Sequence, residues 1–219
     1  MAIDALSQQG ELAAFRDLVA DCTRCPLSQT RTQVVFGSGS PTADLMFVGE
    51  APGFHEDKQG VPFVGAAGQL LGKLLAEIEL TREDVFVANV LKCRPPGNRD
   101  PQPEEIDACE SHLFRQIELI RPKVICTLGN FATKLLSGRP DGITKVHGRE
   151  QEVVLGATRV LLYPIFHPAA ALYTPRMLDT LRADFARLPE ILGRETAPPE
   201  PPPAPAPAEE PAAVQLGLF

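Results

Sequence analysis

Residues 123–138 read KVICTLGNFATKLLSG and contain the repeating unit of the fold. The first six residues of this stretch are mostly apolar, which is typical of a strand buried on both faces of a sheet. The pair Gly129-Asn130 then interrupts the apolar run, and FATKLLSG follows with apolar residues at helical spacing. The stretch therefore predicts a strand, a turn and a helix in succession.

The same alternation continues in both directions along the chain. Further strands are predicted at residues 44–49 and 84–90, and residues 152–155 and 159–163 form either a strand pair or one strand with a turn. Helices are predicted at residues 11–21, 68–78, 103–120 and 175–188. This alternation predicts an α/β fold, a three-layer sandwich around a mainly parallel four-stranded sheet. In such folds ligands bind beyond the carboxyl ends of the strands.

Charge is distributed unevenly along the chain. The 219 residues include 21 Lys and Arg against 28 Asp and Glu, a net charge of −7, which argues against a strongly basic, histone-like binder. Without residues 190–219, the chain has 20 basic and 23 acidic residues and a net charge of −3. The acidity is therefore largely a property of the C-terminus, and the rest of the chain can still carry a basic face.

Proline content divides the chain into three predicted parts. Residues 1–193 are expected to form one folded domain. Residues 195–211 read ETAPPEPPPAPAPAEEP, in which eight of 17 residues are proline, so we expect residues 194–213 to be a disordered, extended linker. Residues 214–219, VQLGLF, are apolar again and are either a frayed end or a peptide that fills a partner's pocket.

The sequence lacks the features of a membrane or secreted protein. No stretch approaches the ~18 uncharged apolar residues of a membrane span. The N-terminus, MAIDALSQQGELAAF, has neither a basic region nor an apolar core of a signal peptide. We therefore expect a cytoplasmic protein with no membrane contact, and a monomer.

Four of the five cysteines have the pattern of a sulfur-ligated metal site. Cys22 and Cys25 form a CxxC motif, and Cys93 and Cys109 from a second segment can complete a tetrahedral set of four thiolates. The spacing does not separate zinc from a [4Fe–4S] cluster, and four unrelated thiols are the minority alternative. Cys126 lies within the apolar run 123–128 and is expected to be a buried strand thiol.

The most specific segment is residues 49–71, GEAPGFHEDKQGVPFVGAAGQLL. A GxxPG turn by itself is only a strand-to-helix connection. Here an acid stands at the strand end, and a Pro-Phe pair and a glycine-rich helix start follow. Free backbone amides at such a turn can bind an anion or a carbonyl oxygen, so the segment indicates a binding site.

Several motifs in one order resemble the family 4 uracil-DNA glycosylases, which are iron–sulfur enzymes of base-excision repair. These motifs are GEAPG, GVPFVGAAGQLL, VANVLKCRPPGNRDP, LGNFATKLL, GITKVHG and HPAA, and the resemblance covers about residues 12–190. It implies a uracil-DNA glycosylase fold and an enzyme that flips uracil out of DNA, hydrolyses its N-glycosidic bond and leaves an abasic site. It also implies a [4Fe–4S] cluster on Cys22, Cys25, Cys93 and Cys109.

The resemblance implies a role for each residue of a uracil pocket. Phe63 stacks on the base, and the amide of Asn89 accepts from N3–H and donates to O4. His167 donates an N–H to O2, where charge develops on the leaving uracil anion. Glu50 either positions or activates the attacking water, stabilises the cationic sugar, or shapes the pocket, and the backbone amide of Ala51 contacts uracil. The alternatives are core packing for Phe63, a cap or turn residue for Asn89 and a structural role for His167, although His167 follows an apolar strand and precedes Pro-Ala-Ala, which favours a functional role.

Two further segments resemble DNA-repair features. Residues 169–176, AAALYTPR, resemble the minor-groove wedge of the family, with Leu172 or Tyr173 inserting and Arg176 on a phosphate. Residues 215–219, QLGLF, resemble the peptide with which bacterial proteins bind the replicative sliding clamp, although Gly217 departs from the usual pattern.

Three alternatives remain at this point. A related glycosylase binds uracil-DNA covalently, but its relatives carry an Arg-rich, His-containing loop where this chain has GITKVHG. A non-catalytic DNA-binding module could keep the same fold, although the joint presence of Glu50, Phe63, Asn89 and His167 weighs against it. A zinc-stabilised binding protein would give a colourless preparation.

Overall fold

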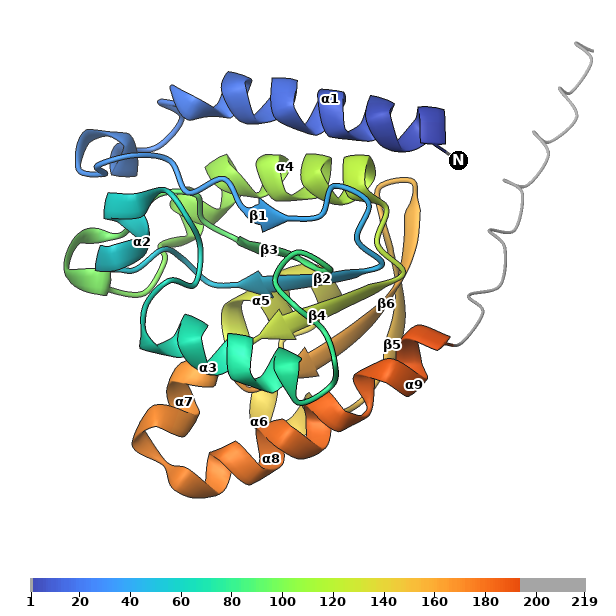
Figure 1. The fold of residues 1–219 in the computed structure, drawn as a ribbon. Helices are drawn as coiled ribbons and strands as arrows, with labels where there is room; N and C mark the ends of the chain where they lie inside the picture. The colour runs from blue at the N-terminus through green and yellow to red at the C-terminus, as the bar shows by residue number, and fades with distance from the viewer. Residues whose placement is uncertain (1, 194–219) are drawn as a thin grey trace, which may run out of the picture.

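The computed structural model describes residues 2–193, which form a sheet between two layers of helices (Figure 1). The predicted linker, residues 194–213, and the predicted peptide, residues 214–219, lie outside the described residues. The helices are α1 (Ala2–Ala20), α2 (Phe54–Gln59), α3 (Ala66–Ala76), α4 (Pro103–Ile120), α5 (Asn130–Ser137), α6 (Ile143–Val146), α7 (Pro168–Tyr173), α8 (Pro175–Ala186) and α9 (Leu188–Gly193). None of the helices in this part of the chain is long and apolar enough to cross a membrane.

The sheet of the described residues has six strands in the order β1-β3-β2-β4-β6-β5. They are β1 (Ser38–Gly39), β2 (Leu45–Gly49), β3 (Phe86–Asn89), β4 (Val124–Leu128), β5 (Gln151–Leu155) and β6 (Thr158–Ile165). The α/β class is confirmed, but the predicted number of four strands is wrong. The four central strands pair in parallel, whereas β1 and β5 add antiparallel edges.

The two edge strands differ in how far the sequence indicates them. Strand β1 has only two residues, too few to show any periodicity. Strand β5 pairs with β6 as a hairpin through Gly156, which has a φ of +61°. The alternative of a strand pair is therefore confirmed over a single strand.

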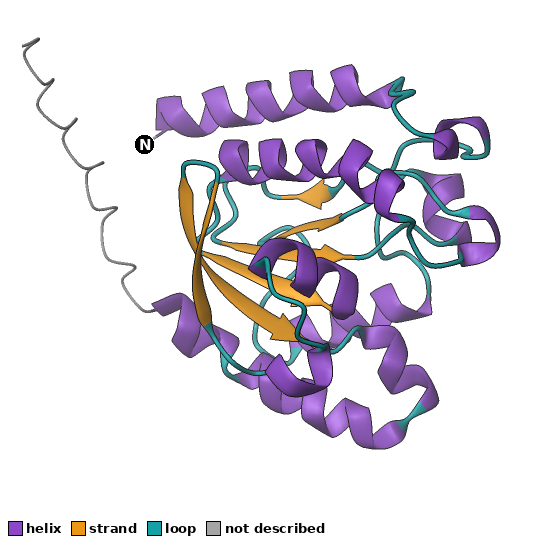
Figure 2. Ribbon diagram, turned by 180° about the vertical axis from the view of Figure 1, so that it is seen from behind, coloured by secondary structure: helices purple, strands orange, loops and turns teal. Residues whose placement is uncertain are grey.

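Alternating residues of the central strands point to opposite faces of the sheet and pack into two hydrophobic cores, one on each face. Met46 and Val48 of β2 pack with residues of α1, α4 and α5, while Leu45 and Phe47 pack with residues of α3, α8 and α9. Figure 2 shows the strands between these two helical layers from behind. The three-layer sandwich follows from this period-two alternation in strands that are buried on both faces.

The parallel central strands end at one common edge of the sheet. Glu50 follows β2, Asn89 is the last residue of β3, and His167 follows β6 after one residue. Helices α2 and α7 gather at the same edge (Figure 1). The structure therefore brings together, beyond the carboxyl ends of the strands, residues that are far apart in the sequence.

Candidate active site

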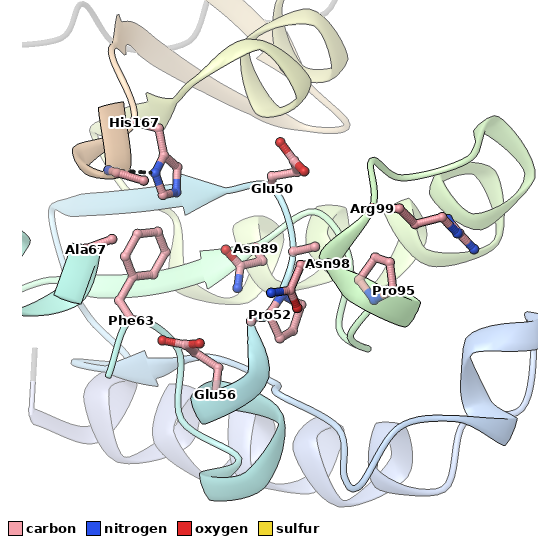
Figure 3. A pocket seen from close by; sticks show the side chains of 13 residues that line it. Glu50, Pro52, Glu56, Phe63, Ala67, Asn89, Pro95, Asn98, Arg99 and His167 are labelled. Carbon is pink, nitrogen blue, oxygen red and sulfur yellow. Dashed lines mark hydrogen bonds between the residues drawn. The ribbon is translucent and has the colours of Figure 1, made fainter. Parts of the chain in front are cut away.

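A pocket of about 430 Å³ lies at this edge of the sheet (Figure 3). All five residues predicted for a base pocket line it, namely Glu50, Ala51, Phe63, Asn89 and His167. The other lining residues are Pro52, Gly53, Glu56, Ala67, Pro95, Asn98, Arg99 and Ala169. The pocket combines one aromatic face, two amides, one imidazole, two carboxylates and one guanidinium, a set suited to a flat polar ligand.

The ring of Phe63 forms one wall of the pocket, stacked against the imidazole of His167. The two ring centroids are 5.4 Å apart and the ring planes differ by 27°. Phe63 has a φ of +56°, in the left-handed region that L-residues rarely adopt. Such a backbone costs about 1–2 kcal/mol, so surrounding contacts must hold it in place.

Those contacts come from both sides of the Phe63 loop. The Oε1 atom of Glu56 accepts hydrogen bonds from the backbone amides of Val64 and Gly65, both at 2.9 Å. On the other side a Cβ at Gly68 would lie 1.6 Å from the carbonyl oxygen of Phe63, so only glycine lets helix α3 approach this closely. The loop is thus clamped between a carboxylate and a helix backbone.

Asn89 presents an unsatisfied acceptor to the pocket. The residue is 2% exposed, and its Oδ1 has no hydrogen-bond partner among the described residues. A Cβ at Gly49 would lie 2.4 Å from this oxygen and 2.7 Å from Cζ of Phe63, so the missing side chain of Gly49 lets both groups reach the pocket. A buried acceptor without a partner is destabilising, so this oxygen is placed for a ligand N–H.

His167 carries its available proton on Nε2. Its Nδ1 accepts a hydrogen bond from the backbone amide of Ala169 at 3.1 Å (Figure 3), which leaves Nε2–H as the donor of the neutral ring. Burial lowers the pKa of His167 to about 4, and the charge of Glu56 opposes this shift. The imidazole is therefore neutral at pH 7 and can donate without transferring a proton.

Glu50 is the second predicted catalytic residue and lies where β2 enters the pocket (Figure 3). Burial, together with the negative charge of Asp100, raises the pKa of Glu50 above its ordinary value. A carboxylate with a raised pKa is a better proton acceptor than a fully solvated one.

Two pocket residues that the motif analysis did not assign have clear structural functions. Glu56 lies in the first turn of α2, where acids are common for electrostatic reasons, so its position in the sequence does not reveal the contact with the Phe63 loop. Arg99 lines the pocket, but its guanidinium forms two hydrogen bonds of 2.9 and 2.6 Å with the carboxylate of Glu105. Arg99 is thus committed to an ion pair.

The four cysteines of the predicted sulfur site pack into a single core cluster. Cys22 and Cys25 follow α1, Cys93 follows β3, and Cys109 lies in α4. Cys109 and Cys25 lie close enough to Cys93 to raise its pKa, and Cys25 and Cys22 lie close enough to Cys109 to raise its pKa. Burial raises the pKa of both Cys93 and Cys109.

Polar hydrogens surround these sulfur atoms. Sγ of Cys109 accepts from the backbone amide of Lys92 at 3.3 Å, and Sγ of Cys93 accepts from Nη1 of Arg31 at 3.4 Å. Sγ of Cys22 lies 3.3 Å from Nε2 of His112. Within residues 2–193, no three His, Cys, Asp or Glu side chains are placed to hold a single metal ion. Cys126 is apart from this group, buried in β4 as predicted.

Lys92 is the most unusual residue beside the cysteines. It is 1% exposed, and its Nζ donates to the carbonyl oxygen of Asn89 at 2.8 Å and to Oε1 of Gln116 at 2.6 Å. Burial lowers its pKa to about 8, and Cys109 and Cys93 act in the opposite direction. An ammonium buried without a carboxylate partner in the described part of the chain is stabilised by negative charge nearby, which deprotonated sulfur atoms of Cys93 and Cys109 would supply.

The predicted DNA-contacting residues lie on the surface beside the pocket. Leu172 and Tyr173, at the end of α7, are 46% and 87% exposed. Arg176, in the first turn of α8, is also exposed. Helix α7 begins directly after His167, and its residue Ala169 lines the pocket.

The sequence is similar to those of known proteins. The family model described as "Uracil DNA glycosylase superfamily" matches residues 36–188. A type-4 uracil-DNA glycosylase of Archaeoglobus fulgidus is 46% identical over 181 residues, which cover 81% of this chain and 91% of the relative. One from Sulfurisphaera tokodaii is 46% identical over 82% of this chain and 84% of its own length, and one from Thermotoga maritima is 50% identical over 69% and 78%. The chain therefore belongs to the uracil DNA glycosylase superfamily and, within it, to the type-4 uracil-DNA glycosylases.

Proposed function

We propose that this protein is a uracil-DNA glycosylase that binds a flipped-out uracil in the pocket and hydrolyses its N-glycosidic bond, leaving an abasic site. The observation that carries the proposal is the pair of open polar atoms in one pocket. Oδ1 of Asn89 lacks a partner, and the neutral imidazole of His167 has its proton on Nε2. Family membership supports the same reaction.

Asn89 selects uracil over cytosine. Its Oδ1 accepts from N3–H of uracil and its Nδ2 donates to O4. Cytosine has an acceptor at N3 and a donor at C4, so both contacts would be lost and buried polar groups left unpaired. Phe63 stacks on the base, and the backbone amide of Ala51 contacts its edge.

His167 stabilises the leaving group. Negative charge develops on O2 as the glycosidic bond breaks, and Nε2–H of the neutral imidazole donates to that oxygen. Glu50 orients the attacking water and stabilises the positive charge of the sugar. Because Glu50 and His167 enter the pocket from different strands, one group can act on the sugar and the other on the base.

A [4Fe–4S] cluster is proposed on Cys22, Cys25, Cys93 and Cys109. The N–H donors around the sulfur atoms and the buried ammonium of Lys92 support an anionic, sulfur-ligated group here. When bound, the cluster ties the segment after α1, the loop after β3 and helix α4 together, and the hydrolysis requires no electron transfer. Purified protein should be yellow-brown, with absorbance near ~400 nm. A colourless preparation that contains zinc would contradict the cluster.

His147 lies in the GITKVHG stretch, where the covalent type of glycosylase carries an Arg-rich, His-containing loop. Its Nδ1 lies 3.3 Å from Oδ2 of Asp184, and its ring centroid is 4.4 Å from that of Phe166. It does not line the pocket. We therefore assign His147 a structural role and propose a monofunctional hydrolase without a covalent protein–DNA intermediate.

Leu172, Tyr173 and Arg176 are proposed to contact DNA next to the flipped nucleotide. Their exposure and their position after His167 support this assignment. Half or more of protein–DNA hydrogen bonds go to phosphate and sugar, which suits Arg176, while Leu172 or Tyr173 fills the space that uracil leaves.

Residues 215–219 are proposed to bind the replicative sliding clamp, with residues 194–213 as a linker to the catalytic domain. These residues lie outside the described structure, so the proposal rests on the sequence. Deleting residues 215–219 should abolish clamp binding without changing uracil release from a short oligonucleotide. Equal clamp binding by the shortened protein would contradict it. The cytoplasmic location and the monomeric state stay predictions.

The direct test of the proposed function is uracil release. The purified protein is incubated with matched single-stranded, U·A and U·G oligonucleotides, and free uracil and alkali-labile abasic sites are quantified. We expect both products from the uracil-containing strands and neither from strands with cytosine or thymine. Absence of uracil release from every substrate would contradict the proposal.

A further inference from the structure

An exposed aromatic ring beside the pocket has two cations on it. Phe54, the first residue of α2, is 44% exposed. Nζ of Lys58 lies 4.5 Å from the centroid of its ring, and Cζ of Arg94 lies 5.1 Å from it. Lys58 comes from the same helix, whereas Arg94 comes from the loop after β3. We call Phe54, Lys58 and Arg94 the α2 surface.

The α2 surface adjoins the pocket at both of its ends. Phe54 directly follows Gly53, which lines the pocket. Nε of Arg94 donates to Oδ1 of Asn98 at 2.6 Å, and Asn98 is another pocket residue. A nucleic acid strand that enters the pocket with one nucleotide therefore passes close to these cations.

The acids of α2 do not neutralise this surface. Glu56 is bound to the amides of Val64 and Gly65. Asp57 is 4% exposed and accepts hydrogen bonds from the backbone and the hydroxyl of Thr32, at 2.9 and 2.6 Å. The helix therefore directs its negative charge inward and presents Lys58 outward.

The two cations themselves are available to an external anion. Within residues 2–193, neither Lys58 nor Arg94 forms an ion pair, whereas Arg99 in the same loop is paired with Glu105. A cation on an aromatic face keeps its full charge, while the ring limits the number of positions that the flexible side chain adopts. Such an arrangement favours phosphate binding over internal pairing.

We propose that the α2 surface binds the phosphate backbone of the uracil-containing strand next to the flipped nucleotide, with the exposed part of Phe54 in contact with an adjacent base. This inference rests on the proposed function and adds a second DNA contact to that of Leu172, Tyr173 and Arg176. Lys58 and Arg94 bind phosphate oxygens, a contact that is independent of sequence. Aromatic contact with a neighbouring base is likewise tolerant of sequence.

The test is the salt dependence of DNA binding by the full chain. The probe is a fluorescent single-stranded oligonucleotide with a stable abasic-site analogue at its centre, so that no turnover occurs during the measurement. The variants are Lys58→Ala, Arg94→Gln and the double variant, and Kd is measured by anisotropy over a series of salt concentrations. Each lost phosphate contact should raise Kd ~3–10-fold and reduce the slope of log K against log salt by about 0.7. Phe54→Leu should raise Kd by a smaller factor.

Lys123→Ala is the control for net charge, at a lysine that is ion-paired with Asp44 at 2.9 Å. Lys123 is exposed and precedes β4, at the amino end of the parallel strands and thus at the opposite edge of the sheet. We expect wild-type Kd and slope for this variant. A wild-type Kd and slope in the Lys58→Ala/Arg94→Gln protein would overturn the inference. An equal rise of Kd in Lys123→Ala would also overturn it, because the rise would then follow from the change in net charge and not from a contact at the α2 surface. Absence of uracil release by the wild-type protein would instead contradict the proposed function.

Discussion

The pocket at the strand ends and the four-cysteine region differ in how far their polar atoms are hydrogen-bonded within the protein. In the pocket, Oδ1 of Asn89 has no partner and Nε2–H of His167 is an open donor. Around the cysteines, sulfur atoms accept from Lys92 and Arg31. The pocket atoms are therefore available to a ligand, whereas the sulfur atoms already have donors within the protein.

Lys92 connects the two regions. Its backbone amide donates to Cys109, and its ammonium donates to the carbonyl oxygen of Asn89. The ammonium beside the cysteine region thereby also supports the end of β3, from which the amide of Asn89 projects into the pocket. A change in one region should still be separable from a change in the other, because rate reports on the pocket and absorbance reports on the cysteines.

The largest expected effect on the pocket is that of His167→Ala. Loss of the donor to O2 should lower single-turnover uracil release ~10²–10³-fold, with absorbance near ~400 nm unchanged. His147→Asn, which changes a histidine outside the pocket, should stay within about threefold of wild type. A wild-type rate in His167→Ala would remove this residue from the mechanism.

Cys109→Ala should change the cysteine region, whereas His167→Ala changes the pocket. We expect loss of most of the absorbance near ~400 nm and a lower melting temperature, because the cross-link between three segments is lost. Cys126→Ala is the control, since it removes a buried thiol from β4, outside the cysteine group, and should keep the absorbance. Retained absorbance and iron content in Cys109→Ala would show that this cysteine does not ligate the cluster.

A smaller effect is expected when the Phe63 loop is released. Glu56→Ala removes the acceptor for two amides and should lower kcat/KM ~10-fold, because Phe63 no longer keeps its left-handed backbone. Glu56→Gln retains an acceptor oxygen and should recover most of this loss. Glu104→Ala, an exposed acid in the first turn of α4, should leave kcat/KM unchanged. Equal loss in the Ala and Gln variants would argue that Glu56 acts through its charge and not through the loop.

The smallest expected effect is on stability at mildly acidic pH. The pKa of His167 is about 4 in the folded protein and about 6.5 in the unfolded chain, so the unfolded chain binds the proton first as the pH falls. The contribution of the neutral imidazole to the free energy of unfolding is complete above about pH 6.5 and decreases toward pH 4. At pH 5 the free energy of unfolding should be lower by on the order of 1–2 kcal/mol. Urea unfolding should therefore depend less on pH in His167→Ala. An equal pH dependence in both proteins would contradict burial of a neutral imidazole.

Much of the fold could be predicted from local pattern. The apolar runs that became β2, β3 and β4 are buried on both faces, and α4 begins at Pro103 and ends at Ile120, within the predicted range. The strand ends also indicated where Glu50, Asn89 and His167 would meet. Edge strands were harder, because β1 is two residues long and part of β5 is solvent-exposed.

The sequence by itself determined the α/β class, the four candidate ligands and the motifs that carry Glu50, Phe63, Asn89 and His167, because these depend on residue type and short-range order. Only the tertiary structure decided which polar atoms have a hydrogen-bond partner within the described residues and which do not. The partnerless oxygen of Asn89, the proton on Nε2 of His167, the clamp of Glu56 on the Phe63 loop and the buried ammonium of Lys92 all depend on contacts between distant segments. Hydrogen bonding and desolvation act over a few ångströms in space, and the sequence order does not reveal those distances.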